Sequence, residues 1–115
     1  MPASPKISKI NVDIPDYIDE AFKMNYKISD CDSFSSFMSR VFSLYLEDPK
    51  KFPLEENDII SYSIDVQKKS STMTFYIPTS MAEIISDLAL RTIRDKRKQS
   101  LFLVYSIYKN MDKIS

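Results

Sequence analysis

Two short stretches of alternating polar and apolar residues, each ending in Ile-Pro, constrain the fold of this chain most. They cover residues 9–15 and 72–78. Because successive side chains of a β-strand point to opposite faces, Ile10, Val12 and Ile14 share one face of the first stretch. A strict period of two predicts a strand in each stretch. The closing proline cannot donate to a β ladder but suits a helix start, so a helix is expected after each strand.

The residues after the first strand predict two helices. Apolar side chains recur at spacings of three and four from Asp16 to about Lys27, which indicates a short amphipathic helix. A second helix is expected to begin with Asp32 or Ser33 as its N-cap and to end by Asp48. Its large aromatic stripe favours the centre of the core over a cofactor or ligand site. The stripe consists of Phe34, Phe37, Met38, Val41, Phe42 and Tyr45.

The residues after the second strand repeat this order. A helix is expected after Pro78, then an inter-helix turn over the basic residues 91–98, then a helix over residues 99–111. Apolar residues surround most of the last helix, which predicts burial on several sides. The buried stripe predicted for the first of these helices consists of Met81, Ile84, Ile85, Leu88, Ala89 and Thr92.

The repeated pattern divides the chain into segments of one compact domain, since one copy has too few residues to close a good core. The linker between the copies is interpreted as an exposed acidic loop followed by an edge strand or extended segment at residues 60–66, which alternate again. The segments are a flexible arm at 1–8, a first copy at 9–52, the linker at 53–70 and a second copy at 71–115, with 9–115 as the compact domain.

Composition limits the classes of function. The chain has no histidine and no glycine, which removes the commonest acid–base catalyst and the glycine-rich phosphate loops. We therefore expect no enzymatic activity, catalytic residue, metal ligand or cofactor. A single cysteine, Cys31, excludes an internal disulfide and suits a reducing cytoplasm, the expected location. No apolar run approaches the roughly 20 residues of a membrane span, so no membrane partner is expected.

The charges of the chain cancel overall but are unevenly distributed. Residues 1–52 hold seven Lys/Arg and eight Asp/Glu (−1), residues 53–70 hold two and four (−2), and residues 71–115 hold seven and four (+3). A net charge of zero weakly disfavours a nucleic-acid partner. The second copy is nevertheless the basic half of the chain.

The doubled order of strand, helix, turn and helix resembles the ribbon-helix-helix family of DNA-binding proteins. The matching features are the alternating strands that end in Ile14-Pro15 and Ile77-Pro78, the short first helix, the polar turn and a second helix with Arg40-Val41. The tandem arrangement, and the segment at residues 47–52, are similar to the TraY proteins of plasmid conjugation. The resemblance implies a mostly α fold with a two-stranded antiparallel β-ribbon, as a tandem ribbon-helix-helix pseudo-dimer with a four-helix core.

The resemblance also implies that the ribbon enters the major groove of double-stranded DNA. The apolar side chains would then lie on the helices, and the outward ones would contact bases. Lysine can donate to guanine and asparagine can pair with adenine, whereas Asp13 departs from many family members and would accept from cytosine or narrow the choice by repulsion. A solvated polar face is the alternative interpretation. The residues expected to contact bases are Lys9, Asn11, Asp13, Thr72, Thr74 and Tyr76.

Phosphate contacts are implied at the start of each second helix, where free backbone amides favour anions. Asp30 and Asp32 would repel a phosphate at the first start, and a solvated turn is the alternative interpretation of the second. The residues expected to contact phosphates are Ser33, Arg94, Lys96, Arg97, Lys98 and Ser100.

Together these features predict a sequence-specific DNA-binding protein that acts as a transcriptional regulator, such as a repressor, or as an accessory factor that marks a plasmid or phage site. Because the outward residues of the two strands differ, we expect a non-palindromic site bound with fixed polarity. Further copies of the chain on adjacent DNA sites are an additional expected partner. The alternative is a protein-interaction module that uses the acidic first copy and residues 60–66.

Overall fold

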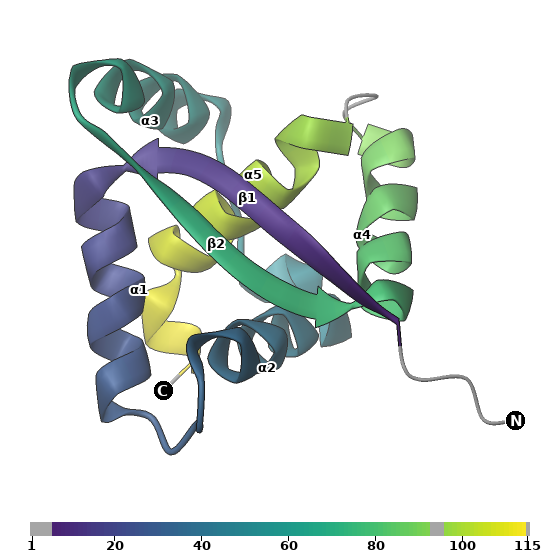
Figure 1. Ribbon diagram of the computed structural model, residues 1–115. Coiled ribbons are helices and arrows are strands. Elements are labelled where there is room, and N and C mark those ends of the chain that lie inside the picture. Colours follow the sequence, from purple (N-terminus) through teal and green to yellow (C-terminus); the bar gives the residue numbers. More distant parts are fainter. Residues whose placement is uncertain (1–5, 93–95, 115) are drawn as a thin grey trace, which may run out of the picture.

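The computed structural model describes residues 6–92 and 96–114 (Figure 1). The described chain is mostly helical, and its two strands form one antiparallel sheet. This confirms the coarse fold predicted from the sequence. The elements are β1 (Ile7–Pro15), α1 (Asp16–Ile28), α2 (Phe34–Glu47), a 3-10 helix (Pro49–Lys51), α3 (Glu56–Lys68), β2 (Ser70–Pro78), α4 (Thr79–Thr92), α5 (Lys96–Lys109) and a 3-10 helix (Met111–Ile114).

The two strands pair within the one chain, and their register places equivalent positions of the two strands opposite each other at the middle of the ribbon. Both strands have nine residues, and Ile7 of β1 lies opposite Pro78 of β2. Strand β2 begins 63 residues after β1, since 70 − 7 = 63. Asn11 and Thr74 lie opposite each other and are also 63 residues apart, since 74 − 11 = 63. They therefore hold the same place in the two strands, at the middle of the ribbon.

Hydrogen bonds at the ends of the ribbon repeat this symmetry. The Asp16 amide donates to the Lys69 carbonyl at 3.2 Å, and the Thr79 amide donates to the Lys6 carbonyl at 3.0 Å. Asp16 and Thr79 are the first residues of α1 and α4. Because the first amides of a helix lack intrahelical partners, each bond satisfies such a donor with the carbonyl of the residue just before the other strand.

The strand begins earlier than predicted. Residues Ile7 and Ser8 belong to β1, and the Ser8 hydroxyl lies 2.9 Å from that of Thr79. The expectation of a flexible arm is therefore wrong for these two residues, while residues 1–5 lie outside the described part of the chain.

The apolar face of the ribbon packs against the helices and forms one side of the hydrophobic core. Phe75 is fully buried and meets Phe42 of α2 edge to face, with ring centroids 5.3 Å apart. The aromatic stripe of α2 is core, as predicted, and α5 is buried on several sides. The buried apolar side chains of the ribbon, α1, α2 and α5 are Val12, Ile14, Met73, Phe75, Ile77, Ile18, Phe22, Phe37, Met38, Val41, Phe42, Leu103, Val104, Tyr105 and Ile107.

The boundaries of the first two helices agree with the sequence. Ser33 is the N-cap of α2, because its Oγ accepts from the Ser36 amide at 3.1 Å. The second half departs further from expectation. Helix α5 begins at Lys96 rather than at residue 99, so residues 96–98 belong to its first turn.

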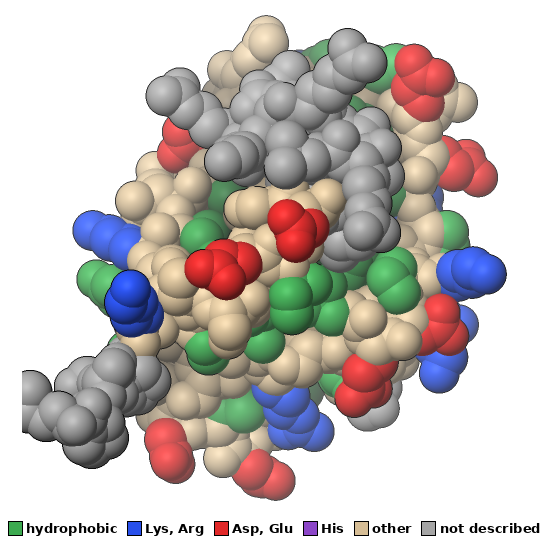
Figure 2. All heavy atoms as spheres, turned by 90° about the vertical axis from the view of Figure 1, so that its right-hand side faces the viewer, with side chains coloured by type: hydrophobic (Ala, Val, Ile, Leu, Met, Phe, Trp, Pro, Cys, Tyr) green, Lys and Arg blue, Asp and Glu red, His purple; other side chains and the backbone are tan. Residues whose placement is uncertain are grey.

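The prediction that Ile84 belongs to the buried stripe of α4 is wrong, because Ile84 is 51% exposed. Figure 2 shows hydrophobic side chains interspersed with acidic ones on the side of the molecule that carries α4. The side chains of Leu88, Ala89 and Thr92 lie outside the described set.

The linker contains a helix that sequence reasoning missed. Residues Glu56–Lys68 form α3, so the expected loop and edge strand are wrong, and α3 adds to the expected four helices. The Asp58 carboxylate accepts from the Glu55 amide at 3.1 Å, a bond typical of a capped helix start. Tyr62 of α3 is buried against Tyr105 and Tyr108, with ring centroids 4.8 and 5.8 Å apart.

The helices leave one broad face of the ribbon uncovered. In Figure 1 the ribbon crosses in front of α5, with α1 on the left, α4 on the right and α3 at the upper left. None of the described helices combines the length and apolar character needed to cross a bilayer.

Candidate nucleic-acid interface

The uncovered face of the ribbon carries all six side chains that the sequence predicts as base contacts. Each is exposed, whereas the residues between them on both strands are mostly buried. The antiparallel register arranges the six side chains as three pairs across the strands. The pairs are Lys9 with Tyr76, Asn11 with Thr74, and Asp13 with Thr72. Sequence reasoning therefore placed these side chains on one surface, and their contact with DNA stays a prediction.

Two of the three pairs are hydrogen-bonded. Thr74 Oγ1 donates to Asn11 Oδ1 at 2.7 Å, and Thr72 Oγ1 donates to Asp13 Oδ1 at 2.6 Å. A hydroxyl has one proton to donate, so each threonine hydroxyl is left only with acceptor lone pairs once it donates to the residue across the strands. These bonds hold the outward side chains in place before any partner arrives, which lowers the entropy cost of binding.

The start of α2 lies beside the end of β2. The Tyr76 amide donates to Ser35 Oγ at 2.9 Å, which joins the first turn of α2 to the edge of the ribbon. A groove of about 500 Å³ at this point has hydroxyl groups and a lysine around it. Helix amides and hydroxyls are donors that suit a phosphate. The groove is lined by Lys6, Ile7, Ser35, Ser36, Ser39, Tyr76, Ile77 and Pro78.

Ser33 is less suited to a phosphate than its neighbours. Its hydroxyl accepts from the Ser36 amide and donates to Ser36 Oγ at 3.0 Å, so it caps the helix. Ser35 and Ser36 line the groove beside the ribbon, and neither is among the residues predicted from the sequence to contact phosphates. The available signal was the cluster of serines at a predicted helix start.

The second predicted phosphate site lies mostly outside the described residues. Arg94 falls in the undescribed segment, and the side chains of Lys96, Arg97 and Lys98 are outside the described set. Ser100 is half-buried and is the fifth residue of α5. Its expected place at the start of the helix is therefore wrong.

Two lysines immediately precede the strands, at opposite ends of the ribbon. Lys6 and Lys69 are equivalent, since 69 − 6 = 63, and the carbonyl of each accepts from the first amide of a helix. Lys69 Nζ lies 3.2 Å from Asp16 Oδ2, and its side chain is 81% exposed. Both ends of the ribbon thus have a cation.

Polar contacts join α3 to α1 and α5 at one end of the ribbon. Tyr17 Oη of α1 donates to Asp65 of α3 at 2.5 Å, and Lys109 Nζ of α5 pairs with Asp58 at 2.7 Å. Desolvation, and then the hydrogen bond to Asp65, raise the pKa of Tyr17 above its ordinary value. Helix α3 is therefore held against α1 and α5 by polar contacts as well as by Tyr62.

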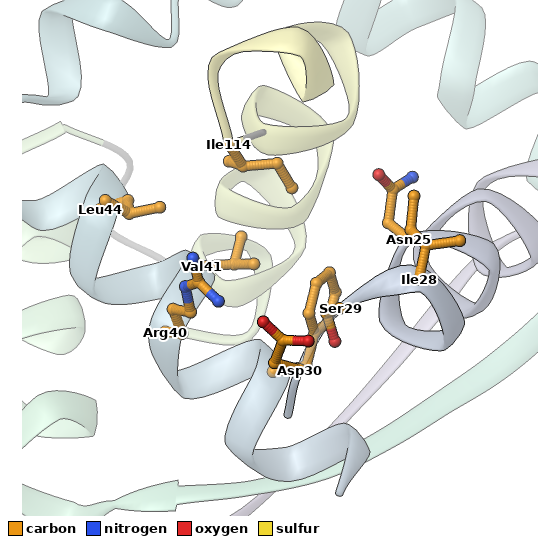
Figure 3. A pocket seen from close by; sticks show the side chains of 9 residues that line it. Asn25, Ile28, Ser29, Asp30, Arg40, Val41, Leu44 and Ile114 are labelled. Atoms are coloured by element: carbon orange, nitrogen blue, oxygen red, sulfur yellow. The ribbon is translucent and has the colours of Figure 1, made fainter. Parts of the chain in front are cut away.

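A second hollow lies away from the groove, at the end of α1. It has a volume of about 280 Å³ and is lined in part by Arg40, Val41, Leu44 and Ile114. Figure 3 shows Arg40 and Asp30 on the same side of this hollow. The described residues contain no group of three or more side chains suited to hold a metal ion.

Comparisons with protein-family models, with curated proteins and with solved structures gave no match to this chain. The functional interpretation therefore depends on the geometry of the ribbon.

Proposed function

We propose that this chain is a sequence-specific double-stranded DNA-binding protein that inserts its β-ribbon into the major groove. The observation that carries the proposal is the row of six exposed polar side chains on a ribbon whose other face forms one side of the hydrophobic core. The major groove of B-DNA is about 12 Å wide and admits a two-stranded ribbon. In this proposal the chain is a tandem ribbon-helix-helix unit, in which each half takes the part of one subunit.

The surroundings of the ribbon support this proposal over a merely solvated face. The groove at the start of α2, lined by three serines among apolar residues, lies at one edge of the ribbon, and Lys6 and Lys69 lie at the ends of the ribbon. Phosphate contacts of this kind fix the position of a protein on the duplex, whereas base contacts specify the sequence. The ribbon therefore offers both classes of contact in one place.

The two halves present different chemistry to the duplex. No outward residue of β1 is repeated at the equivalent position of β2, and α3, which packs against α1 and α5, lies at one end of the ribbon. Symmetric dimers read palindromes because their reading elements are identical. We therefore propose a non-palindromic site bound with one polarity, used in transcriptional regulation or to mark a plasmid or phage site, without an enzymatic step.

The test is selection of sites from a randomised duplex pool at moderate salt, with the purified protein and a Lys9→Ala/Asn11→Ala/Thr74→Ala variant. We expect an asymmetric motif that this variant loses. The matched control is Lys27→Ala/Asn57→Ala/Ser61→Ala, which removes similar groups from exposed positions of α1 and α3 and should retain the motif. Affinity should fall steeply with salt, since phosphate contacts release counterions. A pool that shows no enrichment with the unmodified protein would refute the proposal.

A protein-interaction module is the second candidate, because α3 exposes two isoleucines one turn apart. Ile60 and Ile64 are 51% and 50% exposed. Contiguous exposed apolar side chains are typical of protein contacts. In this case the selection would yield no motif, and Ile60→Ser/Ile64→Ser would abolish the capture of a partner that the ribbon variant still captures.

A further inference from the structure

We infer that the two ends of the ribbon have opposite hydrogen-bonding requirements: the Lys9 end takes base acceptors, and the Asp13 end takes base amino groups. The inference rests on the proposed DNA-binding function and specifies which bases each end favours. It follows from the cross-strand pairs, because the hydrogen bonds within each pair decide which groups remain for DNA.

The Lys9 end of the ribbon is a donor end. Lys9 lies opposite Tyr76, and both side chains are exposed. An ammonium group has three donors and no acceptor, and a phenol hydroxyl can also donate. Guanine presents two acceptors, N7 and O6, on its major-groove edge. This end therefore favours guanine on the strand that it contacts.

The Asp13 end of the ribbon is an acceptor end. Thr72 Oγ1 donates its proton to Asp13 Oδ1 at 2.6 Å. The pair is then left with carboxylate and hydroxyl lone pairs facing outward, which only accept. The donors in the major groove are the amino groups of cytosine N4 and adenine N6. This end therefore favours cytosine or adenine and repels the acceptor edges of guanine and thymine.

The central pair, Asn11 and Thr74, offers both donors and acceptors and so favours neither kind of base edge. Thr74 donates to Asn11 Oδ1, and the asparagine amide retains both its N–H donors and a further lone pair. The central pair is also uncharged. Discrimination between donors and acceptors is therefore concentrated at the two ends, and it orients the protein on the duplex.

A cation lies near the acidic end and lessens its repulsion of the duplex. Lys69 immediately precedes β2, whose first residues pair with the end of β1 that follows Asp13. Asp16 of α1 pairs with Lys69, whose Nζ lies 3.2 Å from Asp16 Oδ2. Lys69 thus supplies a positive charge at the end of the ribbon that carries Asp13, so that Asp13 can act against wrong bases.

The test is parallel site selection with the unmodified protein, Asp13→Asn, Lys9→Gln and Asp87→Asn. Asparagine retains an acceptor for Thr72 and removes the charge of Asp13. The control Asp87→Asn makes the same charge change at an exposed position of α4. We expect Asp13→Asn to reduce discrimination about tenfold at the base pairs of one end of the motif, the size expected for one direct contact. Lys9→Gln should reduce discrimination at the opposite end, and Asp87→Asn at neither.

The outcomes separate the two proposals. If the motif of Asp13→Asn matches that of the unmodified protein, the inference of opposite ends is wrong while DNA binding stands. The inference is also wrong if Asp13→Asn and Lys9→Gln affect the same end. If the unmodified protein enriches no site, both proposals fail. Thermal unfolding of each variant, expected to stay unchanged at these exposed positions, shows that the fold is retained.

Discussion

Thr74 Oγ1 donates a hydrogen bond to Asn11 Oδ1 at 2.7 Å, and the two residues hold the same place in strands that begin 63 residues apart. The bond joins the halves of the chain at the middle of the ribbon, on its exposed face. It therefore belongs to the surface that we propose for recognition and contributes little to the core.

Thr74→Val tests this division between recognition and stability. Valine has the shape of threonine without the hydroxyl, so Asn11 loses its cross-strand donor. We expect weaker discrimination at the centre of the bound site and a change in the free energy of unfolding within about 0.5 kcal/mol, as is usual for exposed positions. Denaturant unfolding and site selection with the same preparation measure the two effects. A large loss of stability would show that this bond supports the fold.

Tyr62→Ala tests whether α3 is part of the folded unit. Tyr62 is 8% exposed and packs on Tyr105. Removing a large buried ring leaves a cavity, so we expect a loss of about 3 kcal/mol in the free energy of unfolding. The control is Ile60→Ala on the exposed side of the same helix, which should change stability by less than about 0.5 kcal/mol. Equal effects of the two substitutions would contradict the packing of α3.

Tyr105→Phe tests a buried hydroxyl of α5. Tyr105 is fully buried, and its Oη has no hydrogen-bond partner among the described residues. Desolvation by burial raises the pKa of Tyr105 to about 12. Because an unpaired buried polar group is costly, we expect Tyr105→Phe to increase the free energy of unfolding by about 1 kcal/mol.

Tyr45→Phe is the contrasting control for this prediction. The hydroxyl of Tyr45 is hydrogen-bonded to Ser106, which is itself buried. Its loss should reduce the free energy of unfolding by about 1 kcal/mol. Chemical denaturation of both variants gives the comparison, and destabilisation by Tyr105→Phe would mean that its hydroxyl has a partner in the folded protein.

The pair of Asp58 and Lys109 predicts a pH dependence of stability. The hydrogen bond from Lys109 lowers the pKa of Asp58 below its ordinary 3.8, and the same bond raises the pKa of Lys109 above 10.5. A lowered carboxyl pKa stabilises the fold above the pKa of the unfolded chain, and this contribution is lost as pH falls through the folded value. A raised lysine pKa stabilises the fold below 10.5, and this contribution is lost as pH rises through the folded value.

We therefore expect the difference in Tm between the unmodified protein and Asp58→Asn to be largest near neutral pH. It should shrink below pH 3.8 and above pH 10.5. Thermal melts across pH measure this difference. The control is Glu56→Gln, at an exposed position two residues away and outside the pair. Its Tm difference from the unmodified protein should not follow this dependence on pH. A difference for Asp58→Asn that is independent of pH would contradict the role of the pair.

The local sequence determined most of the elements. Alternation with a period of two assigned Val12 and Phe75 to the core and Asn11 and Thr74 to the surface, because strand geometry leaves no other choice once one face is buried. Serine and proline positions likewise set the ends of α2, since the cap bond of Ser33 involves residues only three apart.

The linker helix and the pairing of the outward side chains were decided by tertiary structure. Residues 60–66 alternate as a strand would, but Tyr62 meets an aromatic surface on α5 that the linker sequence does not encode, and burial there stabilises a helix. The bond between Thr72 and Asp13 joins residues 59 positions apart. It exists because the register brings the two strands together, and register depends on how both apolar faces pack on the helices.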